Sequence, residues 1–153
     1  MDDTAGTAQR RWLATGRRPE GVSDETVAAT GKASEAMEWI ERARGRLYDF
    51  HQMLGRADLL FGEAVEKLRH AGHDELADGL DREIVGRNVL QGRWTFQVIE
   101  EFDDTYYGPS REWVRRLEGD LVGGWRHVYE SEMKEDRRTS GLRHHEQRPD
   151  PGA

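Results

Sequence analysis

A seven-residue repeat of apolar side chains dominates residues 33–71 and constrains the fold more than any other feature. One column of the repeat carries large residues: Ile40, Leu47, Leu54, Phe61 and Leu68. The column three residues later is mostly alanine: Ala43, Phe50, Ala57, Ala64 and Ala71, extended backwards by Ala33 and Ala36. This pattern predicts a long helix with a narrow buried stripe, because a helix returns to nearly the same face every seven residues. The alanine column lets a neighbouring helix approach closely.

The ends of this helix, and the start of the next one, are marked by capping residues. Ser34 precedes acidic residues that suit a helix N-terminus, and Gly72 is a typical left-handed stop. Asp74 then caps a second helix, whose apolar pattern continues to about residue 106. We therefore predict helices over about 34–71 and 74–106. Because the connection between them is short, they should be antiparallel neighbours.

A third helix is predicted over about 110–136. The sequence Gly108–Pro109–Ser110 indicates a break before it, and Gly123–Gly124 indicates a kink within it. The predicted fold is all-α: an antiparallel hairpin of two long helices, joined by a third to form a three-helix bundle. The bundle domain occupies residues 33–136.

Both ends of the chain are predicted to be flexible. Residues 1–32 show no sustained apolar period, so we interpret them as a disordered arm. Two alternatives are a short helix around Ser23–Thr30, and an arm anchored to the bundle or a partner by Trp12–Leu13. Residues 137–153 contain arginine, histidine and proline and are predicted to form a flexible tail.

Composition excludes several classes of function. The 153 residues carry a net charge of −7, and residues 33–136 hold 23 acidic against 14 basic side chains. Such an acidic body disfavours nucleic-acid binding, which needs a basic surface. The absence of cysteine excludes disulfides and thiolate metal sites and fits a cytoplasmic protein. No apolar run approaches the roughly 20 residues that span a membrane.

The short connection also predicts a register between the first two helices. Facing residues should have numbers that add to about 145. Three polar residues in line on the first helix then meet named partners on the second. The predicted pairs are Arg44 with Glu101, His51 with Trp94, and Asp58 with Arg87. Two of these pairs join opposite charges, which supports the register.

These positions belong to a larger set of polar residues near the predicted seam. The candidate ligand-binding residues are Arg44, His51, Asp58, Glu83, Arg87, Trp94, Gln97 and Glu101. One interpretation is a paired network that sets helix register, since an unpaired buried charge is costly. A second is a polar pocket for a small ligand, with His51 as its titratable group. A third is that the groups lie at the edge of the seam, in water.

Catalytic and metal motifs are weak in this chain. The sequence contains no Glu-x-x-His pair, no Gly-x-Ser-x-Gly nucleophile motif and no phosphate-binding loop. Glu38 and Glu41, with Glu101 and Asp104, resemble the Glu-x-x-Glu and Glu-x-x-Asp carboxylates with which all-α nucleotide pyrophosphohydrolases of the MazG type hold magnesium. On a helical wheel, however, the first two fall on the outer face of their helix. We predict no metal site, no cofactor and no catalytic residues.

The functional prediction is therefore a small acidic helical bundle that acts through protein contacts. Apolar surface on both sides of the second helix favours self-association, most simply as a homodimer. Another, unidentified protein partner could use the arginine-containing tail as a short linear motif. The alternative function is a small-ligand- or metal-binding bundle, with enzymatic activity included, whose site is the polar set in the seam.

Overall fold

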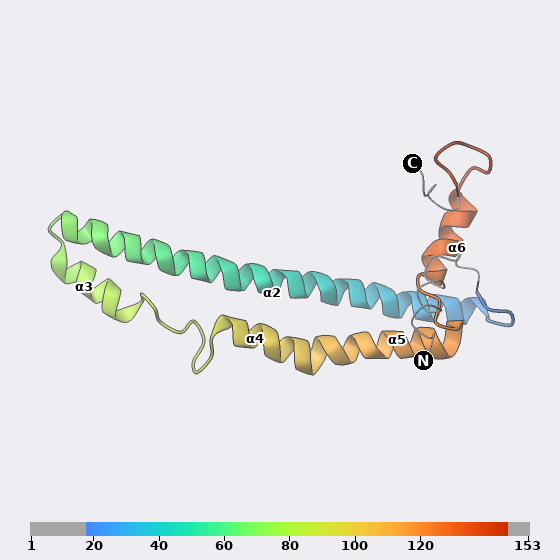
Figure 1. The fold of residues 1–153 in the computed structure, drawn as a ribbon, viewed down its shortest axis with the longest axis horizontal. Helices are drawn as coiled ribbons and strands as arrows, with labels where there is room; N and C mark the ends of the chain where they lie inside the picture. The colour runs from blue at the N-terminus through green and yellow to red at the C-terminus, as the bar shows by residue number, and fades with distance from the viewer. Residues whose placement is uncertain (1–17, 147–153) are drawn as a thin grey trace, which may run out of the picture. The chain divides into compact units, whose positions relative to one another are not determined.

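The computed structural model describes residues 18–146. The named secondary-structure elements in this range are all helices (Figure 1). In chain order they are α2 (Asp24–His70), α3 (Asp74–Glu83), α4 (Thr95–Phe102), the π-helical turn η1 (Asp103–Tyr107), α5 (Gly108–Val122) and α6 (Val128–Arg137). The β pairing in this part of the chain is an isolated bridge between Leu90 and Arg93. The prediction of an all-α fold is confirmed.

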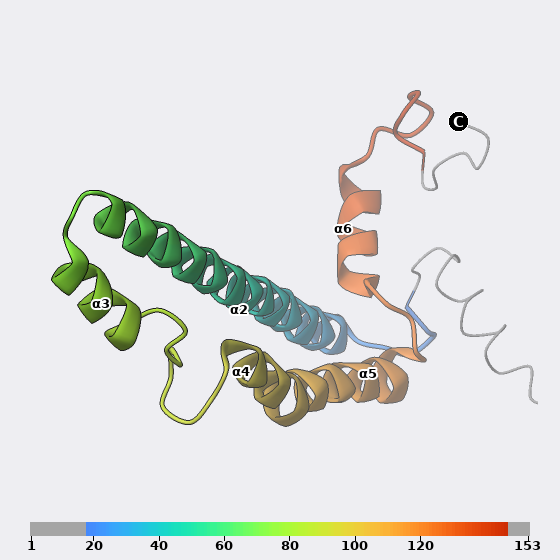
Figure 2. The same ribbon diagram turned by 60° about the vertical axis from the view of Figure 1, so that its left-hand side comes forward.

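The chain divides into two compact units, which we describe separately. The hairpin unit is Ile40–Gly108. The terminal unit combines the described residues before Ile40, from 18 onward, with those from Pro109 to residue 146. In the hairpin unit, Figures 1 and 2 both place α3 alongside the C-terminal end of α2.

Helix α2 begins earlier than predicted. The Ser23 hydroxyl accepts a hydrogen bond from the Thr26 backbone N–H at 3.2 Å, which caps the helix, and Asp24 opens its first turn. The prediction of a flexible arm through residue 32 is therefore wrong for residues 24–32, and the alternative of a helix after Ser23 is confirmed. The arm from residue 1 to 17, with Trp12–Leu13, lies outside the described residues.

The early start of α2 is explained by packing within the terminal unit. Val27 is 2% exposed and clusters with Val122 and Val128. One turn later, Gly31 lies so close to Tyr129 that an added Cβ would be 2.8 Å from the tyrosine Cβ. The contacts that bury the start of α2 thus come from residues about a hundred positions away, and no local pattern reveals them.

The C-terminal end of α2 is as predicted. Gly72 adopts a φ of +81°, and the His73 N–H donates to the Leu68 carbonyl at 2.9 Å. This is a Schellman-type stop, in which a left-handed glycine lets the chain reverse at little steric cost. Lys67, Arg69 and His70 occupy the last turn, where basic groups suit the helix dipole.

The second and third predicted helices are each interrupted. The predicted helix over 74–106 ends at Glu83, and residues 84–94 form a loop before α4. Gly86 and Gly92, both at φ +72°, account for the interruption, because left-handed residues end a helix. The predicted helix over 110–136 breaks between Val122 and Val128, where Gly123 and Gly124 are also left-handed.

The predicted break at Gly108–Pro109–Ser110 is wrong, because α4, η1 and α5 follow one another without a loop. The Gly108 N–H donates to the Asp103 carbonyl, five residues back, as in a π-helix. A proline ring within an α-helix clashes with the carbonyl four residues earlier, and a π turn widens the helix at this point. The π turn thus lets the chain pass through Pro109 while remaining helical.

Candidate functional site

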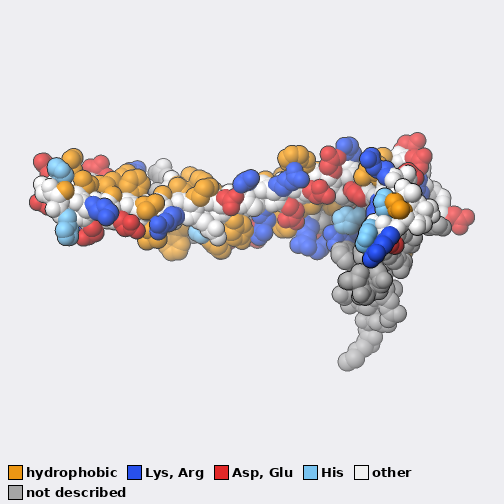
Figure 3. Space-filling model, turned by 90° about the horizontal axis from the view of Figure 1, so that it is seen from above, with side chains coloured by type: hydrophobic (Ala, Val, Ile, Leu, Met, Phe, Trp, Pro, Cys, Tyr) orange, Lys and Arg blue, Asp and Glu red, His pale blue; other side chains and the backbone are white. Residues whose placement is uncertain are grey.

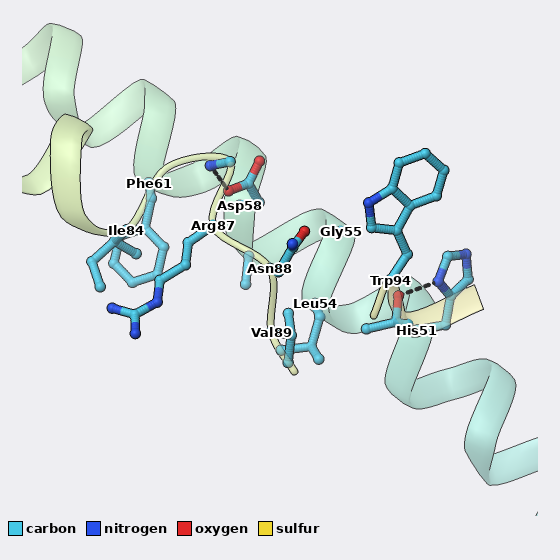
Figure 4. A pocket seen from close by; sticks show the side chains of 13 residues that line it. His51, Leu54, Gly55, Asp58, Phe61, Ile84, Arg87, Asn88, Val89 and Trp94 are labelled. Atoms are coloured by element: carbon cyan, nitrogen blue, oxygen red, sulfur yellow. Dashed lines mark hydrogen bonds between the residues drawn. The ribbon is translucent and has the colours of Figure 1, made fainter. Parts of the chain in front are cut away.

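The hairpin unit contains an open groove of about 630 Å³ between α2 and the stretch from the end of α3 to the start of α4 (Figure 4). Its lining residues are His51, Leu54, Gly55, Ala57, Asp58, Phe61, Ile84, Gly86, Arg87, Asn88, Val89, Trp94 and Thr95. Figure 4 shows Phe61, Ile84 and Arg87 near one end and His51 and Trp94 near the other. Most of the large side chains in the groove are apolar, and the polar groups are few and separated.

His51 contributes a short polar contact at one end of the groove. Its Nδ1 forms a hydrogen bond with the Thr95 hydroxyl at 2.6 Å, and its ring meets Phe96 edge-on, with centroids 5.4 Å apart. The predicted partner of His51 was Trp94, which lines the groove one residue earlier in the chain. Thr95 is the first residue of α4, so this hydrogen bond ties the start of that helix to α2.

The register predicts that Asp58 pairs with Arg87, but the two residues form no ion pair in the structure. The Asp58 Oδ1 accepts a hydrogen bond from the Gly86 backbone N–H at 2.7 Å. An aspartate that binds a loop amide in this way holds the loop against the helix. Arg87 lines the groove, and it makes no ion pair with any other residue in the described part of the chain.

Arg44 forms a bidentate polar contact in the hairpin unit, and again the partner differs from the prediction. Its guanidinium donates two hydrogen bonds to the Asp103 carboxylate, at 2.7 and 2.8 Å, where Glu101 had been predicted. The guanidinium also lies over the rings of Tyr48 and Tyr107, 5.1 and 4.9 Å from their centroids. The hydrogen bonds from Arg44 hold the pKa of Asp103 below its ordinary value.

The other candidate residues serve local structure. Glu101 pairs with Arg93, and Glu83 lies 3.6 Å from its neighbour Arg82. Gln97 accepts a hydrogen bond from the Trp94 N–H at 2.8 Å, which caps α4. Of the eight predicted residues, the groove therefore brings together four: His51, Asp58, Arg87 and Trp94.

The predicted register is more accurate than the predicted pairs. Each observed partner lies within two positions of the predicted one: Asp103 for Glu101, Thr95 for Trp94, and Gly86 for Arg87. The register rule treats the second helix as continuous, so it carries no information about the loop. That is why it missed a backbone amide as the partner of Asp58.

Two of the four carboxylates that resemble the pyrophosphohydrolase pattern have other partners. Glu41 accepts a hydrogen bond from the Tyr107 hydroxyl at 2.8 Å, and Glu101 belongs to the ion pair with Arg93. Among residues 18–146, no group of three or more His, Cys, Asp or Glu side chains is arranged to hold a metal ion. We therefore do not assign a magnesium site to this chain on the basis of the resemblance.

The Arg44–Asp103 contact supports a first prediction. Arg44→Gln should lower the thermal unfolding temperature of the hairpin unit, because it removes the bidentate pair and the contacts with both tyrosines. Arg46→Gln is the matched control: Arg46 is highly exposed and pairs only with Asp49, three residues along the same helix. Circular dichroism melts of both variants measure the difference. Equal melting temperatures for the two variants would show that the Arg44–Asp103 contact adds no more stability than an exposed ion pair.

A second polar cluster lies in the terminal unit, around Glu118 of α5. Burial raises the pKa of Glu118, whereas Arg126, His127 and a hydrogen bond with Ser34 oppose that rise. The charge of Glu130, on α6, adds to it, and Glu130 Oε2 is itself buried without a hydrogen-bond partner among the described residues. The carboxylates of Glu118 and Glu130 thus interact in a partly buried part of the terminal unit.

The raised pKa of Glu118 predicts a pH dependence of stability. A carboxyl whose pKa is higher in the folded state than in the unfolded state stabilises the fold at low pH. That contribution is complete below the unfolded pKa, about 4.3, and is lost as the pH rises through the folded value. Glu118→Gln should therefore raise the unfolding temperature at pH 7 relative to the wild type, and the gain should shrink toward pH 4. Paired melts across that range test this, and a gain that is constant with pH would contradict it.

In residues 18–146, no helix combines the length and the apolar character that a membrane span requires.

Similarity to known proteins does not assign a function to this chain. Comparison of the chain with protein-family models found no match, and neither did comparison with curated proteins or with solved structures.

Proposed function

We propose that this chain is a non-catalytic protein-interaction module, and that its hairpin unit binds the apolar surface of another protein molecule. One observation carries the proposal: in the hairpin unit, twelve large hydrophobic residues are exposed, whereas three hydrophobic residues are buried. Its buried hydrophobic residues are Val65, Ala77 and Ile99. Its exposed large hydrophobic residues are Phe50, Met53, Leu59, Leu60, Phe61, Leu76, Ile84, Val89, Leu90, Trp94, Phe96 and Tyr106.

The size of this exposed surface is that of an interface. Each of the twelve side chains exposes on the order of 80–100 Å², so together they expose roughly 1,000 Å². A standard protein–protein interface buries about 800 Å² on each partner. Single exposed apolar side chains are ordinary, but a contiguous patch larger than a few hundred Å² marks a binding surface.

Figure 3 shows several groups of hydrophobic side chains along the part of the molecule that the hairpin unit occupies. The groove adds Leu54 to this surface. A small unit with three buried apolar residues gains little stability from its own core. Covering the patch would supply burial that the unit lacks, which favours a protein partner over a solvated face.

Proximity labelling in the organism that makes the protein tests the proposal. The wild type is compared with Met53→Glu/Leu60→Glu, which places charges on the exposed apolar face of α2, and with Gln52→Glu as a control on another face. We expect a defined set of labelled proteins, this chain included, to be lost with the double variant and kept with the control. Identical labelling patterns for all three proteins would overturn the proposed function. A cytoplasmic location is part of the proposal.

Small-ligand binding is a second candidate, favoured by the groove itself. Its volume of about 630 Å³ falls in the range of roughly 300–1,000 Å³ that is usual for ligand sites. It combines apolar walls with His51, Asp58 and Arg87. Native mass spectrometry of the protein from its own organism would show a retained small molecule as added mass. His51→Leu should remove that mass and leave the fold intact, and a spectrum without added mass would decide against this candidate.

A further inference from the structure

We infer that the partner of the hairpin unit is a second copy of this chain, packed antiparallel along α2 through Met53, Ala57, Leu60 and Ala64. This inference rests on the proposed function, since it names the occupant of the same apolar surface. The large and small residues on α2 and the charges beside them support this second copy.

The four residues lie on one face of α2. At 100° per residue their directions fall within about 60° of one another. Met53 and Leu60 are 63% and 46% exposed, and neither lines the groove. The groove is lined instead by residues centred about a quarter-turn further round, such as Leu54 and Phe61. Met53 and Leu60 therefore lie on an apolar face of α2 beside the groove, which we call the free face. Ala57, which also lines the groove, lies at the border between the two.

The large and small residues on the free face are complementary to one another. In an antiparallel pair, facing residues have numbers with a constant sum. A sum of about 117 places Met53 opposite Ala64 of the second copy, and Leu60 opposite Ala57 of the second copy. Both small residues then receive a large one, so the two helices can approach closely and fill the space between them.

The charges beside the free face agree with the same register. Asp49, Arg56, Glu63 and Lys67 line one flank of the face. With this sum, Asp49 lies next to Lys67 of the second copy, and Arg56 next to Glu63 of the second copy. Among the described residues, Arg56, Glu63 and Lys67 form no ion pair, and Asp49 pairs only with Arg46 of its own helix, at 3.0 Å.

A parallel pair would have the opposite effect. With α2 side by side and in register, the charged flank of one copy lies against the opposite flank of the other. The pairings of Asp49 with Lys67 and of Arg56 with Glu63 would then be lost. Met53 would also face Met53, and Ala57 would face Ala57, so the large and small positions would not fill one another. The antiparallel arrangement, with a two-fold axis near residues 58 and 59, is therefore favoured.

The mass of the purified chain is the first measurement. We expect sedimentation equilibrium to give twice the chain mass of 17.6 kDa for the wild type and for Gln52→Glu. Leu60→Glu should give the single-chain mass with its helical circular dichroism retained, because the new charge would face Ala57 on both sides of the two-fold axis. A wild type that sediments as one chain at every concentration reached would overturn the inference. So would a Leu60→Glu variant that remains a dimer.

The register can then be measured directly, since the chain contains no cysteine and single cysteines can be introduced for spin labels. In the proposed dimer, labels at Gln52→Cys are about 20 Å apart along the helix axis, and labels at Arg46→Cys about 38 Å, at roughly 1.5 Å per residue. Pulsed electron paramagnetic resonance should show this difference. Equal distances at the two positions would indicate a parallel pair and contradict the inference.

Failure of this inference can be told apart from failure of the proposed function. A monomeric chain whose labelling partners depend on Met53 and Leu60 would disprove the second copy and retain an interaction module with another partner. A monomeric chain whose labelling does not depend on them would disprove both.

Discussion

Replacing Ile99 by alanine is expected to cost the hairpin unit about 2–5 kcal/mol of unfolding free energy, the usual range for emptying a buried isoleucine site. Ile99 is 1% exposed and is one of three buried hydrophobic residues in the unit. With so little core, few neighbouring side chains can move to fill the cavity. Chemical denaturation followed by circular dichroism, at one fixed protein concentration, measures the loss.

Ile84→Ala is the matched control for this prediction, because it makes the same chemical change at a residue that is 39% exposed. Its loss should be clearly smaller, since part of its side chain already contacts water. Equal losses for Ile84→Ala and Ile99→Ala would mean that the hairpin unit has no core centred on α4. The same two variants also distinguish a core residue from an interface residue. If a partner covers Ile84, the unfolding free energy lost in Ile84→Ala should grow with protein concentration.

The same substitution, glycine to alanine, is expected to have opposite effects at two positions of α2. At Gly31 the new Cβ would lie 2.8 Å from the Tyr129 Cβ and 2.9 Å from its Cγ. The tyrosine Cβ is attached directly to the backbone of α6, so relief requires a shift of that helix. Overpacking of this kind costs about 1–3 kcal/mol. Gly31→Ala should therefore destabilise the terminal unit.

At Gly45 no heavy atom lies within 4 Å of the added Cβ. There the substitution should raise the free energy of unfolding by up to about 1 kcal/mol, because alanine favours the helix and restricts the unfolded chain. Thermal and chemical unfolding of the two variants give the signs. A Gly31→Ala variant that is stabilised as much as Gly45→Ala would show that α2 and α6 are not in contact at this point.

Part of the site could be read from the sequence because its causes are local. Gly72 stops α2, and the short connection after it sets the register that brings Arg44, His51 and Asp58 close to their partners. The partners themselves could not be read in this way. Asp103 sits in a π turn and Gly86 in a loop, and both departures from α-helix shift which group faces α2.

The sequence alone determined that the chain is all-α, where α2 ends, and how far along the chain its partners lie, because helix period and glycine caps act over a few residues. Ser23 marks one possible start of α2 in the sequence, and tertiary structure decided that the helix begins there, since Val27 is buried by Val122 and Val128. It also decided which apolar residues stay exposed. The apolar repeat includes Leu54 and Phe61 but not Met53 and Leu60, and only the packing of α3, α4 and the loop between them decides which apolar residues of α2 are covered.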